Sequence, residues 1–361
     1  MRVTILGAGN MGQPICFAME RFGYQVTLVD SSMDALKRCD SFLEQEATLK
    51  HVKDWRSGIS ADTEVLISSL PFYENEEVAK YCITNGVRYC DLGGNVEISQ
   101  KINAMAENKA SKPVMTDLGL APGMVNMLTE HLYKELAKET GKNPETVKMM
   151  VGGIPRTADR KDPFNYYCNW SIDGLLNEYT EYSTILENSE ITSVAPFTGY
   201  EVFDTKSLGR IEAFHTSGGA SHTIETLKRL GAVNVCYKTL RWPGHARTMT
   251  LLLEKCELDK ETMYGIMQKN CAQIPTLDCV MVLIVVDDRI QEILIPAEDG
   301  FSAMQRSTGF SVACAASLIG EGNYDDYKSI RYEDMSFVDF NLKMDILIGT
   351  PQVEEEDENE L

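Results

Sequence analysis

Several features that would place this chain in a common class are missing from its sequence. No run approaches the roughly 18 consecutive apolar residues of a membrane span, so we expect no membrane segment. Basic residues are scarce: 34 Lys and Arg stand against 54 Asp and Glu, and the formal charge of −20 excludes a nucleic-acid binder that neutralises phosphates. The N-terminus leads directly into an apolar strand pattern without a signal peptide, so we expect a cytoplasmic location.

Metal-ligand spacings are missing too. The ten cysteines are scattered without a C-x-x-C pair, and the five histidines do not supply the short spacings of a zinc site. Scattered cysteines in a long chain are mostly buried thiols. We therefore expect no structural metal.

The pattern that is present changes along the chain. With 361 residues, 43% of them apolar, the chain is long enough for about two domains. In the first third, short apolar runs alternate with helical patterns, which is typical of a doubly wound parallel sheet. Strands are expected at 3–6, 25–29, 65–70, 88–92 and 113–116, and a helix at 75–84.

From about Val147 onwards, strands predominate. They are expected at 149–154, 166–170, 200–205, 212–216, 235–240, 280–286 and 289–295, with Asp287 and Asp288 turning the last two into a hairpin. A helix rich in small residues is expected at 302–319, and the acidic tail 351–361 is expected to be disordered. The sequence thus predicts an α/β protein whose middle part is a large, mostly antiparallel sheet.

The strongest local motif is Gly7-Ala8-Gly9-Asn10-Met11-Gly12, which follows an apolar strand and opens an amphipathic helix. In such a loop Gly7 allows a tight turn, Gly9 lets the backbone approach a pyrophosphate, and Gly12 lets the helix press on the sheet. The helix N-terminus adds free N–H groups that attract phosphates. We therefore predict that the whole loop binds a dinucleotide.

The second strand ends at Asp30, followed by Ser31, where a carboxylate would bind the ribose hydroxyls of an adenosine. A 2′-phosphate there would meet like charge, so we predict NAD as cofactor and NADP as the less favoured one, with Lys37 and Arg38 as the opposing feature. The strand expected at 65–70 leads into Ser69, Leu70 and Pro71. These three residues either lie beside the nicotinamide ribose or form a plain strand-to-helix loop.

Six motifs in one order carry a resemblance to a known family. They are 7–12, 91–95, 118–126, 169–179, 212–219 and 238–245. With them the chain resembles the saccharopine dehydrogenase-like superfamily as far as about residue 345, and within it the lysine 6-dehydrogenase-like proteins. The resemblance implies a Rossmann domain at 1–121 and 302–350, an inserted α+β catalytic and substrate domain at 122–301, and a homo-oligomer.

The resemblance also implies a chemistry. Members of the superfamily oxidise or form a C–N bond of an amino acid or amine, with a nicotinamide as hydride carrier. Arg241 matches the family arginine that grips a substrate carboxylate, a task suited to a guanidinium. Trp170 and Tyr73 match aromatic positions that line the substrate cleft, and Asn126 is assigned to the catalytic group as part of the third motif.

The proton-accepting group is less well defined by the sequence. One group with a pKa near 7 would serve both deprotonation of an ammonium and hydrolysis of an imine. His245 and His215 are the candidates because each lies in a family motif, although relatives often carry another residue at the position of His215. Lys238 and Asp91 could equally tune the site.

Ala121 narrows the range of expected substrates and reactions. Saccharopine-forming members carry Asp in a Leu-Asp-Pro-Gly loop where this chain has Ala121, so one carboxylate is missing from the site. This favours oxidative deamination of lysine or a close analogue, to a semialdehyde that cyclises to a piperideine carboxylate. The alternatives are a reductive condensation of an amine with an aldehyde or oxo acid, as in saccharopine or carboxynorspermidine formation, and a non-catalytic nucleotide-binding protein.

Overall fold

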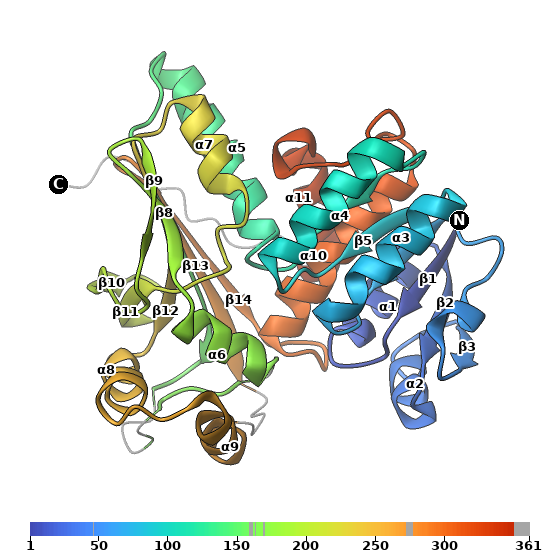
Figure 1. Ribbon diagram of the computed structural model, residues 1–361, viewed down its shortest axis with the longest axis horizontal. Coiled ribbons are helices and arrows are strands. Elements are labelled where there is room, and N and C mark those ends of the chain that lie inside the picture. Colours follow the sequence, from blue (N-terminus) through green and yellow to red (C-terminus); the bar gives the residue numbers. More distant parts are fainter. Residues whose placement is uncertain (46, 159–161, 163, 169, 272–276, 350–361) are drawn as a thin grey trace.

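Two sheets with their surrounding helices make up the computed structural model of the chain (Figure 1). The structure describes residues 1–45, 47–158, 162, 164–168, 170–271 and 277–349. The acidic tail 351–361, predicted to be disordered, lies outside the described residues. No helix of the described part is long and apolar enough to cross a bilayer.

The first sheet is parallel throughout. Its strands lie in the order β3-β2-β1-β4-β5-β6. They are β1 (Arg2–Leu6), β2 (Gln25–Asp30), β3 (Thr48–His51), β4 (Val65–Ser68), β5 (Arg88–Asp91) and β6 (Val114–Met115). The order reverses between β1 and β4, which creates the crevice where open α/β sheets bind ligands. The short strand β3 was not predicted, because its four residues are mostly exposed and contain no apolar run.

Helices cover this sheet, and each begins or ends on a recognisable signal. They are α1 (Gly12–Arg21), α2 (Met33–Asp40), α3 (Asn75–Asn85) and α4 (Val96–Lys109), with short 3₁₀ turns at Trp55–Gly58 and Phe72–Glu74. Ser32 and Asn95 cap α2 and α4 through their side-chain oxygens. Gly86 ends α3 in the left-handed conformation, as expected of a glycine after a helix.

The chain returns to the first sheet at its C-terminal end. Helix α10 (Ala303–Gly320), capped by Ser302, packs against α1 and against strands of both sheets. A Cβ at Gly309 would lie 2.4 Å from Pro14 Cγ, so a small residue is needed for α10 to approach α1 this closely. A 3₁₀ turn at Tyr332–Asp334 and helix α11 (Phe337–Ile348) follow. The predicted helix at 302–319 is confirmed.

The second sheet is mixed and mostly antiparallel, as predicted. Its main path runs β10-β11-β12-β7-β13-β14, with β12 and β7 parallel and the other pairs on the path antiparallel. These strands are β7 (Thr146–Pro155), β10 (Glu201–Thr205), β11 (Gly209–His215), β12 (Asn234–Arg241), β13 (Asp278–Val286) and β14 (Arg289–Pro296). The hairpin at Asp287 and Asp288 is confirmed by the pairing of Val286 with Arg289.

One strand prediction in this region is wrong. The segment 166–170 forms no strand in its described residues; instead Tyr166 and Cys168 are buried in a cluster of aromatic and sulfur side chains. The apolar residues of this segment are explained by the packing of a buried loop rather than by pairing with a neighbouring strand. Two strands were missed, β8 (Ser183–Glu187) and β9 (Glu190–Val194), which form a hairpin at the side of β12.

The helices of the second region are α5 (Met124–Thr140), α6 (Ile172–Thr180), α7 (Thr223–Leu230), α8 (His245–Thr250), a π-helical turn at Leu251–Lys255, and α9 (Lys260–Cys271). In Figure 1, α6 lies on the side of the second sheet that is turned towards the first sheet.

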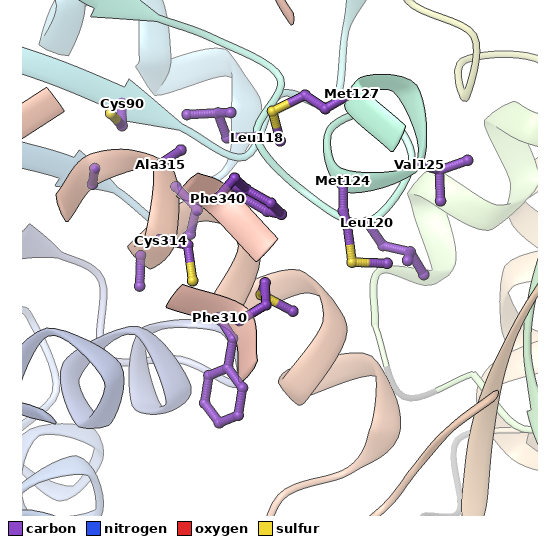
Figure 2. Close-up of a cluster of buried hydrophobic side chains, with 14 of the residues drawn as sticks. Cys90, Leu118, Leu120, Met124, Val125, Met127, Phe310, Cys314, Ala315 and Phe340 are labelled. Carbon is purple, nitrogen blue, oxygen red and sulfur yellow. The ribbon is translucent and has the colours of Figure 1, made fainter. Parts of the chain in front are cut away.

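A shared apolar core joins the two regions. Figure 2 shows Phe310 and Cys314 of α10 in one cluster with Cys90 of β5, Leu118 and Met124. This burial fixes the start of α5 relative to the carboxyl ends of the parallel strands. The domain boundaries at 121/122 and 301/302 stay a prediction.

Candidate active site

The glycine-rich loop is held by close backbone contacts. Gly7 has a positive φ of 96°, and its N–H donates to the carbonyl of Val29 at 2.9 Å. A Cβ at Gly7 would lie 2.7 Å from the Ser69 carbonyl oxygen, and one at Gly12 would lie 2.0 Å from the Gly7 carbonyl oxygen. The structure therefore brings the loop and the 69–71 segment together, as the cofactor prediction requires.

Gly9 stands in open space, in contrast to its neighbours in the motif. No atom lies within 4 Å of a Cβ placed on it, and Gly9 and Asn10 are both exposed at the start of α1. The carbonyl of Asn10 accepts a hydrogen bond from Gln305 Nε2 at 2.9 Å, so α10 supports the loop from behind. This leaves a backbone cradle that fits a pyrophosphate.

Asp30 is fixed at the edge of this cradle. Its Oδ2 accepts from the Ala8 N–H at 2.7 Å, and its Oδ1 accepts from the Ser32 N–H at 2.7 Å. Ser31 is exposed beside it, and its carbonyl contacts His51 Nε2 at 3.0 Å. Each carboxylate oxygen has a second lone pair for a ribose hydroxyl, because a carboxylate can accept about four hydrogen bonds.

A buried pair of acids lies where β5 and β6 end. Asp91 Oδ1 accepts from the N–H groups of Gly93 and Asp117, whereas Asp91 Oδ2 is fully enclosed without a partner in the described part of the chain. Burial and the nearby charge of Asp117 raise the pKa of Asp91 to about 7. The Asp117 carboxylate accepts from Ser99 and Ser221.

The loop 217–221 connects this sheet edge to the second region. Ser221 Oγ donates to Asp117 Oδ2 at 3.0 Å, while the Ser217 N–H donates to the Glu178 carbonyl of α6 at 3.2 Å. Asn126 donates to the carbonyls of Gly219 and Ala220, and its Oδ1 accepts from the Gly123 N–H. Asn126 is fully buried, so its amide ties the start of α5 to this loop.

Arg241 is the centre of the second half of the site. Its side chain is only 3% exposed. The guanidinium donates from Nε to Tyr179 Oη at 3.0 Å and from Nη1 to the Leu240 carbonyl at 2.9 Å, and it lies 4.3 Å over the ring of Tyr166. No residue in the described ranges accepts from Nη2 or forms an ion pair with the guanidinium.

A hydrogen-bonded chain runs from Arg241 to His245. His245 Nδ1 lies 2.6 Å from the Phe164 carbonyl, so Nδ1 carries the proton and donates it. Its Nε2 then accepts from the Tyr179 hydroxyl at 2.9 Å, and the same hydroxyl accepts from Arg241 Nε. Arg241 Nε, the Tyr179 hydroxyl and His245 Nδ1 thus each have an acceptor, whereas Arg241 Nη2 has none in the described part of the chain.

This arrangement gives His245 a fixed, neutral imidazole. Burial and the charge of Arg241 lower the pKa of His245 to about 3, with the Phe164 carbonyl acting in the opposite direction. Both ring nitrogens are engaged within the protein. The structure brings His245 into the group around Arg241, as a partner of Tyr179.

His215 is not part of this group. It pairs with Lys238 across β11 and β12, and successive residues of a strand alternate between the faces of a sheet. Lys238, three positions before Arg241, therefore points to the opposite face, where it contacts Glu201, and His215 Nδ1 contacts Thr198 there. Burial, with the charge of Lys238, lowers the pKa of His215 to about 4.

The two aromatic candidates lie in different surroundings. Trp170 Nε1 donates to Tyr166 Oη at 3.0 Å, and the ring of Tyr166 is the one over which the Arg241 guanidinium lies. Tyr73 is 65% exposed in the 3₁₀ turn that follows Pro71, and its ring contacts only Phe72 among the described ring contacts. Trp170 thus joins the Arg241 group, and Tyr73 stands next to the 69–71 segment at the predicted cofactor edge.

Three residues of the Arg241 group were not singled out from the sequence. Tyr179 and Glu178 lie in the fourth motif, and Tyr166 lies just before it. Their signal was present only as part of a family motif, because nothing in the local pattern indicates that they face β12.

Comparison with known proteins identifies the family to which this chain belongs. Residues 3–116 match the model of the saccharopine dehydrogenase NADP binding domain, and residues 119–341 match that of the saccharopine dehydrogenase C-terminal domain. The chain belongs to the saccharopine dehydrogenase family. This is a family of oxidoreductases with an NAD(P)-binding domain, and the match confirms the resemblance. The parallel six-stranded sheet with a second, mixed sheet confirms the fold class.

Individual relatives are more distant. The mitochondrial alpha-aminoadipic semialdehyde synthases of Bos taurus and Rattus norvegicus are each 24% identical to the chain, over 196 and 197 residues. These alignments cover 53% and 54% of the chain but only 21% of each relative, so the match spans about a fifth of the length of these curated proteins.

Two solved structures share the fold over nearly the whole chain. Saccharopine dehydrogenase (L-Glu forming) from Saccharomyces cerevisiae superposes with a TM-score of 0.71 at 15% identity, covering 95% of this chain and 96% of the other. Homospermidine synthase from Legionella pneumophila, solved in complex with NAD, gives 0.71 at 14% identity, with 97% and 90% covered.

Proposed function

We propose that this protein is an NAD-dependent dehydrogenase that oxidises the C–N bond of an amino acid, with the terminal amine of lysine or a close analogue as the reacting group. The product would be a semialdehyde that cyclises to a piperideine carboxylate, with ammonia released.

The observation that carries this proposal is the unpaired charge of Arg241. Buried charges in proteins are normally paired, because an uncompensated charge away from water is costly. Arg241 is buried, yet no described carboxylate forms an ion pair with it. A substrate carboxylate that accepts from Nη2 would supply the missing anion, and Tyr179 and Tyr166 hold the guanidinium in place for it.

The cofactor assignment depends on the first sheet edge. When bound, a nicotinamide dinucleotide would accept the hydride, and the exposed backbone at Gly9 and the carboxylate of Asp30 fit its pyrophosphate and its adenosine ribose. Because Asp30 would repel a 2′-phosphate, we propose NAD over NADP. Calorimetry with both dinucleotides tests this: Asp30→Ser should weaken NAD and narrow its advantage over NADP, whereas tighter binding of NADP to the unchanged protein would reverse the assignment.

The reaction is tested by NAD(P)H formation with an amine panel. Lysine and cadaverine form a matched pair, because cadaverine keeps both amines but lacks the carboxylate that Arg241 would bind. We expect turnover on lysine and a much lower kcat/KM on cadaverine. Turnover on another amine with none on lysine would overturn the substrate assignment.

Two other outcomes would favour the alternatives. Consumption of NAD(P)H that requires both an amine and an aldehyde or oxo acid would indicate reductive condensation. Tight dinucleotide binding without hydride transfer to any amine would indicate a non-catalytic protein.

A further inference from the structure

A carboxyl group without a partner lies beside Arg241. Glu178 is in the last turn of α6, directly before Tyr179, whose hydroxyl holds Arg241. Its backbone carbonyl accepts from Ser217, but no described residue donates to its carboxylate or forms an ion pair with it. A partly buried carboxylate in this state is available to a ligand.

The position of Glu178 relative to the predicted cofactor edge follows from the hydrogen bonds of one short loop. Ser217 binds the Glu178 carbonyl, and Ser221, four residues later, binds Asp117 at the carboxyl end of the first sheet. Helix α6 is also on the side of the second sheet that is turned towards the first (Figure 1). Glu178 therefore stands between the predicted nicotinamide edge and the guanidinium of Arg241.

The surroundings of Glu178 suit proton transfer near neutral pH. Burial raises the pKa of Glu178 to about 7, while the positive charge of Arg241 limits the rise. General acid–base catalysis is most effective when the pKa of the proton-transferring group is near the working pH. The charged and titratable groups that face it are Arg241 and Tyr237 of β12, Tyr179 of α6, and Cys168.

The other candidates for this task are engaged within the protein, face the other side of the sheet or are fully enclosed. His245 uses both ring nitrogens within the protein, and His215 and Lys238 lie on the opposite face of the sheet. Asp91 keeps Oδ2 without a partner in the described part of the chain, but the residue is fully buried and this oxygen atom is enclosed, so a substrate does not reach it. Glu212 also lies near Arg241, but its carboxylate accepts from the Gly244 and Ala246 N–H groups and from the Tyr200 hydroxyl. Of these two carboxyl groups near Arg241, Glu178 is the one to which no described residue donates.

We propose that Glu178 is the catalytic group that removes the proton from the reacting ammonium of the substrate and later from the water that hydrolyses the imine; this rests on the proposed function. In the first step an N–H bond breaks, and its proton goes to the Glu178 carboxylate and on to solvent. The freed lone pair forms the C=N bond as the C–H electron pair leaves as a hydride to the nicotinamide dinucleotide.

Hydrolysis reuses the same carboxylate. Water adds through its oxygen to the imine carbon, and its proton passes to Glu178 and then to the nitrogen. The C–N bond then breaks, and ammonia leaves with the remaining hydroxyl proton as ammonium, so that the aldehyde is formed. One proton is released overall for each hydride transferred.

The test is the pH profile of Glu178→Gln. Because the base must be ionised, kcat/KM of the unchanged enzyme should rise with pH through about 7 and then level. E178Q should lose this limb, with kcat lowered by roughly 100- to 10,000-fold and KM within about threefold. The exposed Glu181, at the end of the same helix, supplies the control variant E181Q, which should keep rate and profile.

A second readout does not depend on turnover. Difference infrared spectra of the protein between acidic and alkaline pH should contain a carboxylic acid C=O band that titrates near pH 7 and is missing in E178Q but present in E181Q. A band that titrates near the ordinary value of about 4.3 would overturn the proposal. So would a soluble E178Q with raised KM but unchanged kcat, since that result indicates binding of the ammonium only.

Failure of the two proposals can be told apart. Absence of turnover on every amine with either dinucleotide rejects the proposed function, and this role of Glu178 with it. Turnover on lysine with an unchanged profile in E178Q rejects Glu178 alone. If E178Q does not fold, Glu178→Asp should shift the limb of the profile, and an unshifted limb would contradict the proposal.

Discussion

The two halves of the candidate site are built from different materials. The edge of the first sheet is built mainly from backbone groups: Gly7 and Gly12 bring main chain close to main chain, Gly9 leaves open space, and Asp30 binds two backbone N–H groups. Around Arg241, side chains bind side chains, and the contacts join residues 62, 66 and 81 positions apart. A backbone site is sensitive to added volume, whereas a buried side-chain site is sensitive to a missing partner.

Gly9 and Gly12, both in the glycine-rich loop, test the backbone half, and the largest expected effect is at Gly12. In Gly12→Ala the new Cβ would overlap the Gly7 carbonyl oxygen at 2.0 Å, and neither backbone can yield easily. We expect a loss of stability above about 4 kcal/mol, seen as insoluble protein or a greatly lowered Tm. Gly9→Ala meets no protein atom, so it should keep its Tm and lose dinucleotide binding by calorimetry.

The contrast between these variants is the informative result. Equal stability of G12A and the unchanged protein would contradict the close packing of the loop. Full dinucleotide affinity in G9A would show that the pyrophosphate does not lie over Gly9.

Arg241→Met tests the side-chain half. It fills similar volume but removes the cation, so kcat/KM for an amino-acid substrate should fall by roughly 2–4 kcal/mol, or about 30- to 1,000-fold, mainly through KM. The rate on cadaverine, which has no carboxylate, should change little. Arg241→Lys is the control that keeps the charge without the planar guanidinium. An unchanged KM for lysine in R241M would reject the anchoring role.

The difference in construction also explains what could be predicted from the sequence. The glycine loop was predicted because its signal is local: six consecutive residues follow a strand and open a helix. The strands of the second sheet were mostly predicted from their apolar runs. The strand prediction for 166–170 was wrong because a buried loop and a buried strand can have the same apolar composition.

The Arg241 group could not be assembled from pattern alone. Its hydrogen bonds join β12, α6, α8 and the loop at Phe164, and no local rule gives the pairing of distant elements. His215 and His245 were both candidates from the sequence, with His245 favoured, and the register of β11 on β12 then placed His215 with Lys238 on the other face. Glu178 was hidden for the same reason, since its motif gives its neighbours in sequence but not its neighbours in space.

Asp91 is an exception to the division into a backbone half and a side-chain half, because it is a buried side chain at the edge of the first sheet. Its pKa of about 7 in the folded protein lies above the ordinary 3.8. The folded state therefore holds this proton more tightly, so the stability it contributes is present at low pH and is lost as pH rises towards 7. Between about pH 5 and 8 the loss should be on the order of 3 kcal/mol.

Asp91→Asn removes this titration. Urea unfolding should show that the free energy of unfolding of D91N falls less between these pH values than that of the unchanged protein, by about that amount. The exposed Asp173 provides the control variant D173N, which should keep the full pH dependence. An identical pH dependence in D91N would mean that Asp91 ionises normally.

The smallest effect is expected from Tyr179→Phe, which removes one oxygen atom from the side-chain half. Arg241 Nε then loses its acceptor and His245 Nε2 its donor, while the volume of the ring is unchanged. A buried polar group without a partner costs about 1–3 kcal/mol, so Y179F should be destabilised by about 2 kcal/mol in urea unfolding and should bind dinucleotide as before. Tyr182, three positions later and 68% exposed, gives the control variant Y182F, with no expected change. If Y179F and Y182F unfold at the same urea concentration, the hydroxyl of Tyr179 does not hold the Arg241 group together, and the second half of the site would depend on packing rather than on completed hydrogen bonds.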